Sequence, residues 1–381
     1  MGSKCDGNLS KIQWNVIIIL FLILCSGASC TESISPREIV SSSLPIDQLW
    51  LAQLEEPLSA QPVLTTEVVI AQTAKALYGL DKNSGQQLWK YPFRERQSSP
   101  IPVISTNGGF VVFGDKSGTV TALSAMSGEV KWQRQHCGKE NYFSIASILS
   151  EQEKVFVASQ PTAIEAIYLE NGSVSWSHCE INDTLFPSRG ARLFIGEEEK
   201  LYVVTTEVHL INLDNGIIEQ AFEDNLAGAQ QLIHERFYGK SRVWDANTMK
   251  QISLLTSPSY IPLHGDCEDF KFPFILEANY LFAAGNCGGV FSLDLESYEI
   301  VQTYLSDLYV MGSIAVYKDA LYALTSNGEI HAFDPINGRS VGLLKTNQSV
   351  GGTVILPYGI LSDNEVLVVT FGDDAIYVFK K

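Results

Sequence analysis

The stretch LYGLDKNSGQQLWK, residues 77–90, joins an apolar run, a polar turn ending in Gly85, and a tryptophan four residues after that glycine. The same outline returns in VTALSAMSGEVKW from Val120, in IEAIYLENGSVSW from Ile164 and in IHAFDPINGRSVG from Ile330. A unit that recurs every 20 to 50 residues or so indicates a modular, repeated architecture. The repeat is therefore the first evidence on the fold.

Alignment on the turn glycine reveals seven units, whose anchors are Gly85, Gly128, Gly172, Gly216, Met249, Tyr298 and Gly338. Six residues before the anchor the side chain is mostly small, and five residues before it the side chain is always apolar. Alternate residues of a strand face opposite sides. Each unit therefore contains a strand that is buried on both faces, as expected when sheets are stacked around an axis.

Three units carry a tryptophan four residues after the anchor, namely Trp89, Trp132 and Trp176. A tryptophan ring buries on the order of 150–250 Å², so we predict that these three side chains dock neighbouring sheets. The later units have other residues at this position: Gln220, Ser253, Gln302 and Gly342. We expect the later sheets to dock by different contacts.

Another apolar strand precedes each of these hairpins, so each unit is predicted to form four antiparallel strands, and helical periodicity is absent from the sequence. The last unit ends at AIYVFKK without an outer strand, which DQLWLAQL, residues 47–54, is placed to supply. That pairing would hide both terminal strand edges. We predict an all-β β-propeller of eight four-stranded blades, closed by the N-terminal strand. Seven blades stay an alternative, because the unit around Trp244 is short and irregular.

The unit LYGLDKNSGQQLW resembles the PQQ-like β-propeller repeat, which quinoprotein dehydrogenases share with BamB-type outer-membrane assembly lipoproteins. The resemblance covers residues 44–381 and implies the fold, but repeat residues hold blades together and imply no activity by themselves. Quinoprotein dehydrogenases carry two adjacent cysteines over the cofactor and a Glu, Asn and Asp group around calcium, and this sequence matches neither. The resemblance therefore favours a non-catalytic protein without cofactor over a PQQ-dependent dehydrogenase-like enzyme.

The amino terminus resembles an export signal. The apolar run VIIILFLIL, residues 16–24, follows Lys4 and Lys11 and precedes small residues. It is shorter than the roughly 20 residues that span a bilayer, which favours a signal peptide over a permanent anchor. Cleavage before Cys30 would resemble a bacterial lipobox and make Cys30 a lipidation candidate, whereas ordinary cleavage before Ser29 is the alternative.

The chain is thus expected to have three parts. Residues 1–30 form a signal peptide or lipoprotein signal, residues 31–46 a flexible tether, and residues 47–381 the propeller domain. The serine-rich composition of TESISPREIVSSS, from residue 31, is the basis for the tether.

Four cysteines follow the signal: Cys137, Cys179, Cys267 and Cys287. Their places in the repeat put all four in connections on one rim of the ring. An even number of cysteines in an exported protein favours disulfides, and the repeat most easily permits Cys137–Cys179 between adjacent blades and Cys267–Cys287 within one blade. Histidines near three of these cysteines leave a zinc site as an alternative, although the spacings match no compact metal motif.

The chain is acidic, with 43 Asp and Glu against 26 Lys and Arg and a formal charge of −17. A nucleic-acid surface needs clustered Lys and Arg, and no basic run exists beyond FRER around Arg94, so nucleic acid is not an expected partner. The sequence shows no catalytic, cofactor-binding or metal motif. We predict a monomeric, extracytoplasmic scaffold, periplasmic or on the cell surface, that binds a protein or a small ligand at its rim or funnel. Its membrane contact would run through a lipid on Cys30.

Overall fold

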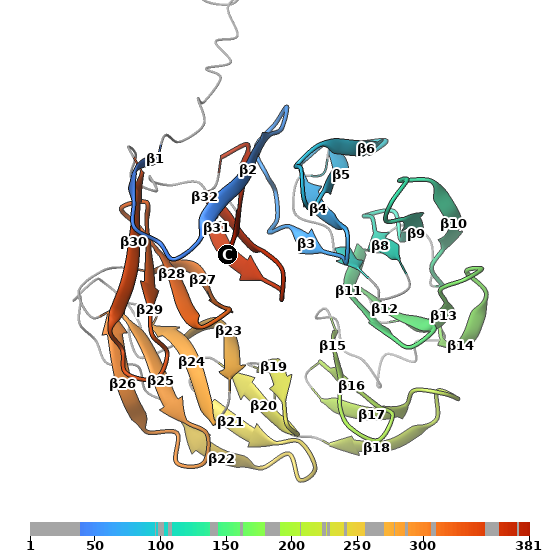
Figure 1. Ribbon diagram of the computed structural model, residues 1–381. Coiled ribbons are helices and arrows are strands. Elements are labelled where there is room, and N and C mark those ends of the chain that lie inside the picture. The colour runs from blue at the N-terminus through green and yellow to red at the C-terminus, as the bar shows by residue number, and fades with distance from the viewer. Residues whose placement is uncertain are drawn as a thin grey trace, which may run out of the picture. The chain divides into compact units, whose positions relative to one another are not determined.

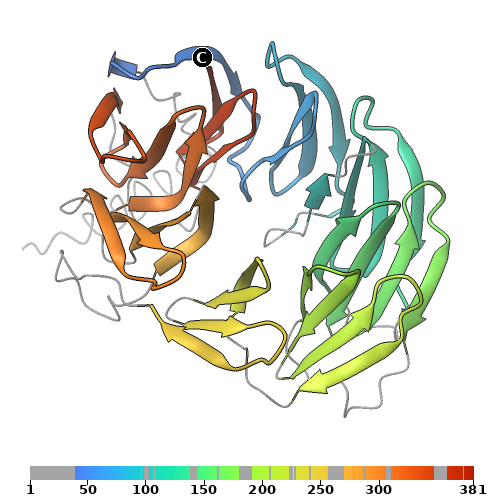
Figure 2. The same cartoon turned by 60° about the horizontal axis from the view of Figure 1, so that its bottom comes forward.

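The computed structural model describes residues 39–95, 97, 103–105, 109–137, 144–160, 163–179, 191–205, 207–222, 226, 229–239, 242–255, 270–277, 279–285, 289–305, 310–346, 358–371 and 373–381. All of these lie in the compact unit Pro36–Lys381. Within them every regular element is a strand, and the strands form eight sheets around a common axis (Figures 1 and 2). The predicted all-β, eight-bladed β-propeller is confirmed. No helix among these residues is long and apolar enough to cross a membrane.

Blades 1 to 6 are each continuous in sequence, and their four antiparallel strands run from the inside of the ring to the outside (Figure 1). Blade 1 holds β3 (Val63–Leu64), β4 (Val68–Gln72), β5 (Ala76–Asp81) and β6 (Gln87–Pro92), and blade 2 holds β7 (Val103–Ser105), β8 (Phe110–Gly114), β9 (Thr119–Ser124) and β10 (Val130–Gln135). Blade 3 holds β11 (Ser144–Glu151), β12 (Lys154–Gln160), β13 (Ile164–Tyr168) and β14 (Val174–His178).

The next three blades repeat the arrangement. Blade 4 holds β15 (Arg192–Ile195), β16 (Lys200–Val204), β17 (Val208–Asn212) and β18 (Ile218–Phe222). Blade 5 holds β19 (Ala229–Ile233), β20 (Arg236–Gly239), β21 (Arg242–Asp245) and β22 (Gln251–Leu254). Blade 6 holds β23 (Phe270–Glu277), β24 (Tyr280–Gly285), β25 (Val290–Asp294) and β26 (Ile300–Leu305).

Blade 8 is built from both ends of the chain. It holds β31 (Tyr358–Ser362), β32 (Leu367–Phe371), β33 (Ala375–Lys380) and, as its outer strand, β2 (Asp47–Gln53). The register runs antiparallel from Asp47 opposite Lys380 to Gln53 opposite Ala375. Figure 1 shows blue β2 beside the red C-terminal strands. The predicted closure of the ring by the N-terminal strand is confirmed.

Blade 7 has one strand more than the repeat predicts. It holds β27 (Val310–Tyr317), β28 (Ala320–Thr325), β29 (Glu329–Phe333) and β30 (Ser340–Thr346), and β1 (Ile39–Ser42) pairs with the edge of β30. Residues 39–42 are therefore part of a sheet, although we expected a flexible tether over 31–46. Gly342 makes room for this segment, because a Cβ there would lie 2.7 Å from Ser43 O and 2.8 Å from Leu44 Cα.

Tryptophan docks successive blades. Trp89, Trp132 and Trp176 are 7–8% exposed. The Nε1 of each ring donates a hydrogen bond to a carbonyl oxygen of the next blade, at Ala125 (2.7 Å), Leu169 (2.6 Å) and Leu213 (2.9 Å). Trp50 of β2, which the sequence analysis did not identify, makes the same bond to Lys82 O at 2.8 Å. Each acceptor stands three residues before an anchor glycine.

The anchor glycine is required for two reasons. Gly128 has a φ of +67°, which glycine adopts without a steric cost. A Cβ at Gly128 would also lie 2.6 Å from the ring of Trp89 in the preceding blade. The tryptophan therefore occupies the space that a side chain at the anchor would need.

Two of the later junctions keep the acceptor and change the donor. Arg236 Nη1 donates to Leu295 O at 2.9 Å, and the hydroxyl of Tyr304 donates to Pro335 O at 2.5 Å. Both acceptors again stand three residues before an anchor, Tyr298 and Gly338. Tyr298 has a φ of +60°, so the turn keeps its shape without glycine.

An ion cluster around the buried Lys82 joins the first blade to the last. Lys82 follows β5 and is 3% exposed, and its Nζ lies 2.5 Å from Asp363 Oδ2 and 3.0 Å from Glu365 Oε2 in the turn before β32. Burial alone would raise the pKa of Asp363, but the hydrogen bonds from Lys82 and from two backbone amides hold that pKa below its ordinary value of 3.8. Burial alone would likewise lower the pKa of Lys82, and the bonds to Asp363 and Glu365 raise it.

We predict that Gly128→Ala destabilises the fold more than Gly109→Ala. Both glycines have positive φ, at +67° and +79°, so both alanines are strained, but nothing lies within 4 Å of the Cβ position at Gly109. Overpacking against Trp89 should cost about 1–3 kcal/mol more at residue 128, measured by urea unfolding. Equal losses in the two variants would contradict the docking role of the glycine.

We also predict that Asp363→Asn lowers the free energy of unfolding at pH 7 by about 1–3 kcal/mol, because Lys82 loses a charged partner. The folded-state pKa of Asp363 lies below that of the unfolded chain, so this stabilisation is present above about pH 4 and is lost as the pH falls through the folded-state value. Urea unfolding at pH 7 and near pH 3 should show the gap between wild type and variant closing in acid. Asp319→Asn is the control, since Asp319 is 91% exposed beside Lys381. A gap at pH 7 no larger than that of the control would argue against the cluster.

Candidate functional site

Neighbouring blades face each other across a space that we call a wedge, between the outer strand of one blade and the third strand of the next. Two repeat positions, six and eight residues after the anchor, enter the wedge from the first blade, and a position seven residues before the next anchor enters from the second. The backbone is built alike in the first two wedges, because Phe93 N donates to Lys75 O (2.8 Å) as His136 N donates to Gly118 O (2.9 Å).

Ionic groups fill the wedge between blades 2 and 3. Its three positions hold Arg134, His136 and the buried Glu165. Arg134 Nη2 lies 2.9 Å from Glu165 Oε1, and His136 Nδ1 lies 2.5 Å from Oε2, which also accepts the backbone N–H of Cys137 at 3.0 Å. Burial alone would raise the pKa of Glu165, but these partners hold it below the ordinary value. This wedge is closed by polar groups that hydrogen-bond one another, and Arg134 Nε is the one of them left without a partner among the described residues.

The structure brings two of the four cysteines together. Cys137 and Cys179 form a disulfide between blades 2 and 3, at the end of this filled wedge. Cys30, Cys267 and Cys287 lie outside the described residues. This disulfide is one of the two that the sequence repeat favours.

The donor set near the disulfide does not suit a metal. Among the described residues, His136, Cys137 and Glu165 place ligand atoms within 4.8 Å of one another. The sulfur of Cys137 is bonded to Cys179 and the carboxylate of Glu165 is held by Arg134. His178, the other histidine beside this bridge, points to Gly216 O at 2.7 Å. Zinc binds thiolates rather than disulfide sulfur, so these residues in their present state do not fit it.

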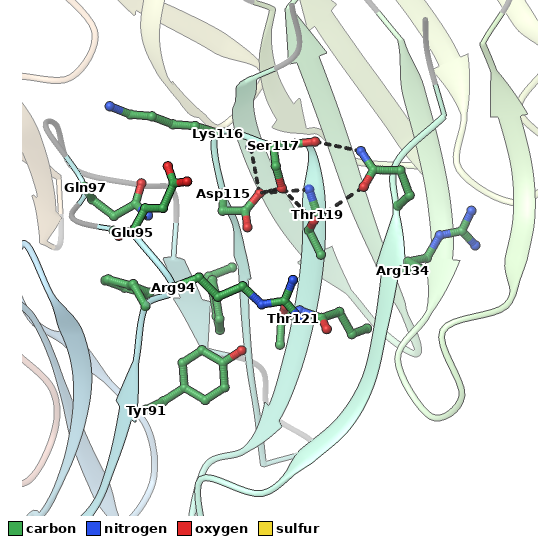
Figure 3. A pocket seen from close by; sticks show the side chains of 14 residues that line it. Tyr91, Arg94, Glu95, Gln97, Asp115, Lys116, Ser117, Thr119, Thr121 and Arg134 are labelled. Atoms are coloured by element: carbon green, nitrogen blue, oxygen red, sulfur yellow. Dashed lines mark hydrogen bonds between the residues drawn. The ribbon is translucent and has the colours of Figure 1, made fainter. Parts of the chain in front are cut away.

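The wedge between blades 1 and 2 is open. The same three positions hold Tyr91, Phe93 and Thr121, and the threonine is much smaller than the glutamate that fills the next wedge. A pocket of about 480 Å³ results, shown in Figure 3. Arg134 points away from the other labelled side chains in this view, toward its partners in the filled wedge.

One wall of the pocket is aromatic. The ring of Phe113, on β8, lies edge to face with Tyr91 at 5.4 Å between centroids and with Phe93 at 6.0 Å. The rings come from two blades, so the contact that packs the blades also shapes the wall. Aromatic side chains give such a wall a large rigid surface.

Beside Phe113 the same face of blade 2 continues as a polar wall, because Thr121 pairs with Phe113 on one side and with Gln133 on the other. Gln133 Nε2 donates to Thr121 Oγ1 at 3.0 Å, and Gln135 Nε2 donates to Ser117 O at 2.7 Å. Asp115 Oδ1 accepts the Ser117 hydroxyl at 2.6 Å and so fixes the turn between β8 and β9. These bonds hold the amide and hydroxyl groups in fixed orientations before any ligand arrives.

Gln97 supplies an unusual acceptor beside the pocket. Its side chain is 8% exposed and its Nε2 donates to Glu95 O at 3.1 Å, yet Oε1 has no hydrogen-bond partner among the described residues. Figure 3 places Gln97 and Glu95 across from the Asp115–Thr119 turn. A buried acceptor without a partner costs about 1–3 kcal/mol, which a ligand hydrogen bond would recover.

Sequence reasoning missed this pocket, although part of its signal was present. The repeat columns already place Thr121 where the next unit has Glu165, so a loss of volume could have been found there. Gln97 lies in a connection outside the repeat and gives no such signal. A second pocket of about 550 Å³ beside Tyr168 and Asn171 has no comparable buried acceptor among its described residues.

The eight blades, the strand–turn–tryptophan unit and the closing blade built from both ends of the chain agree with the PQQ-like β-propeller resemblance found in the sequence, which the comparisons confirm. A family model described as outer membrane protein assembly factor BamB matches residues 47–216.

Solved structures give the same result for the fold. BamB from Moraxella catarrhalis is 14% identical with a TM-score of 0.60, and the match covers 89% of this chain and 98% of that one. The computationally designed Ika8 protein is 13% identical with a TM-score of 0.62, covering 88% and 99%. The quinohemoprotein alcohol dehydrogenase ADHIIG from Pseudomonas putida HK5 is 10% identical with a TM-score of 0.61, covering 88% and 76%. A search of curated proteins finds no match.

Proposed function

We propose that this chain is a non-catalytic binding scaffold that holds a small ligand, or a side chain of a partner protein, in the pocket between blades 1 and 2. The observation that carries the proposal is the open wedge with its unpartnered acceptor, beside an equivalent wedge that the same three repeat positions fill. Similarity to a protein described as an outer membrane assembly factor supports a scaffold role.

The chemistry of the pocket supports binding rather than catalysis. Its described lining contains no histidine and no cysteine. The carboxylate of Asp115 accepts hydrogen bonds from Ser117 and Thr119 within its own turn. Arg94 and Glu95 are exposed at its edge. The Ser117 hydroxyl donates to Asp115 Oδ1, but that oxygen also accepts the backbone N–H groups of Ser117 and Thr119, which is the pattern of a turn rather than of an activated nucleophile. The similarity to a quinohemoprotein alcohol dehydrogenase supports the competing proposal of a PQQ-dependent enzyme.

We further propose that the scaffold is exported and tethered by a lipid on Cys30, on the strength of the apolar run at residues 16–24 and the small residues before Cys30. Mass spectrometry of the mature protein should find an N-terminal peptide that begins at Cys30 and carries a diacylglyceryl group, and Cys30→Ala should abolish the adduct. An unmodified peptide that begins at Ser29 or Cys30 would refute the lipid anchor and keep export, whereas an intact residue 1 would refute both.

For the scaffold itself, we predict that a photoreactive benzoyl-phenylalanine at Arg94, at the edge of the pocket, gives a discrete adduct in cells of the source organism. Thr121→Tyr should abolish the adduct because it fills the pocket, and the fold already buries Tyr78 at the equivalent position of blade 1. The same probe at Ile336, which is 82% exposed on blade 7, is the control.

Two results would contradict the scaffold proposal. An Arg94 adduct that persists in a well-folded Thr121→Tyr protein would place the partner outside the pocket. Dye-linked alcohol oxidation by the purified protein after addition of PQQ and Ca²⁺ would favour the enzyme.

A further inference from the structure

The pocket between blades 1 and 2 combines features that select one chemical class of ligand. We propose that it binds a neutral saccharide, with a pyranose ring against the aromatic wall and hydroxyl groups on the polar wall. This inference rests on the proposed binding function and specifies its ligand.

The two walls match the two kinds of surface on a sugar ring. The C–H face of a pyranose is apolar, and the negative face of an aromatic ring attracts such weakly positive hydrogens. Tyr91 and Phe93 supply this surface from blade 1, where they pack against the buried ring of Phe113. A wholly polar ligand would leave these rings without a matching partner.

The polar side excludes a wholly apolar ligand. Side-chain amides and hydroxyls both donate and accept, as sugar hydroxyls do. Gln133, Thr121 and Ser117 are oriented by their own hydrogen bonds. An apolar ligand would leave the buried Gln97 Oε1 without a partner. A sugar hydroxyl can donate to it.

The charges around the pocket favour a neutral ligand. Arg94 and Lys116 are balanced by Glu95 and Asp115 in the lining, and the guanidinium of Arg134 is committed to Glu165 and Gly172 O outside it. The whole chain carries a formal charge of −17, which repels anions at long range. A phosphorylated or acidic sugar therefore gains no net attraction.

The size of the pocket agrees with a ligand of one or two rings. Its volume of about 480 Å³ lies in the usual range for small-molecule sites, roughly 300–1,000 Å³. A protein–protein interface usually buries about 800 Å² on each partner. This pocket is much smaller than such an interface and could receive only one side chain of a partner protein.

Saturation-transfer NMR with the full mature chain tests the proposal. The probes are cellobiose, maltose, lactose and N,N′-diacetylchitobiose, with digalacturonate as the acidic comparison. We expect saturation transfer to the ring C–H protons of at least one neutral disaccharide and weaker transfer to digalacturonate. Thr121→Tyr should abolish this transfer. Phe93→Ala, and Gln97→Leu, which keeps the approximate size of the side chain, should each weaken affinity about tenfold or more.

The variants separate binding from folding. Gln97→Leu removes a buried unsatisfied oxygen, so we expect its melting temperature to equal or exceed that of the wild type while its affinity for the disaccharide falls. Ile336→Ala is the matched control, because it changes an exposed side chain on blade 7 and should leave binding unchanged.

Three outcomes would overturn the saccharide inference. One is the absence of transfer to every neutral disaccharide while the Arg94 adduct still depends on Thr121, in which case the scaffold proposal survives with a protein or another ligand. Another is binding that persists unchanged in folded Thr121→Tyr and Gln97→Leu proteins. The third is tighter binding of digalacturonate than of any neutral probe.

Discussion

The structure depends on the contact between an indole ring of one blade and the turn glycine of the next. A four-stranded sheet cannot bury both of its faces alone, so each blade is stable only against its neighbours. Trp89 fills the space that a side chain at Gly128 would need, and its N–H fixes the ring to Ala125 O. Where tryptophan is absent, Arg236 and Tyr304 donate to the equivalent carbonyl. In these six junctions the acceptor is therefore the constant part of the docking contact, and the donor varies.

Closure extends the same contact to the junction between blades 8 and 1. β2 completes blade 8 and also carries Trp50, so the strand that pairs with the C-terminal sheet also docks that sheet onto blade 1. Lys82 strengthens the same junction, because its carbonyl accepts the Trp50 indole and its ammonium group holds Asp363. The N-terminal segment continues this role at blade 7, where β1 covers the edge of β30 that would otherwise be open to pairing.

Most of the fold could be predicted from the sequence because its signals are local. The period, the alternation along strands and the turn glycines predict four-stranded blades, and the missing last strand predicts the closure. The docking role of Trp50 was missed because this residue precedes the first complete unit. β1 was missed because the sequence indicates only that Gly342 replaces a docking tryptophan, and not that it makes room for another segment. The pocket could not be predicted in the same way, since it depends on bulk that is missing between side chains of two different blades. Gln97, in a connection outside the repeat, carries no periodic signal at all.

The repeat separates positions that build the ring from positions that decide what each wedge does, and β10 shows how the two wedges are linked. Alternate residues of a strand face opposite sides, so Gln133 and Gln135 line the open wedge while Arg134 faces the filled one. The ion cluster around Glu165 and the Cys137–Cys179 disulfide therefore lie directly behind the polar wall of the pocket. A binding site loses less entropy on occupation when its groups are already held. The filled wedge thus backs the open one, and the two wedges differ at three repeat positions that come from two neighbouring blades.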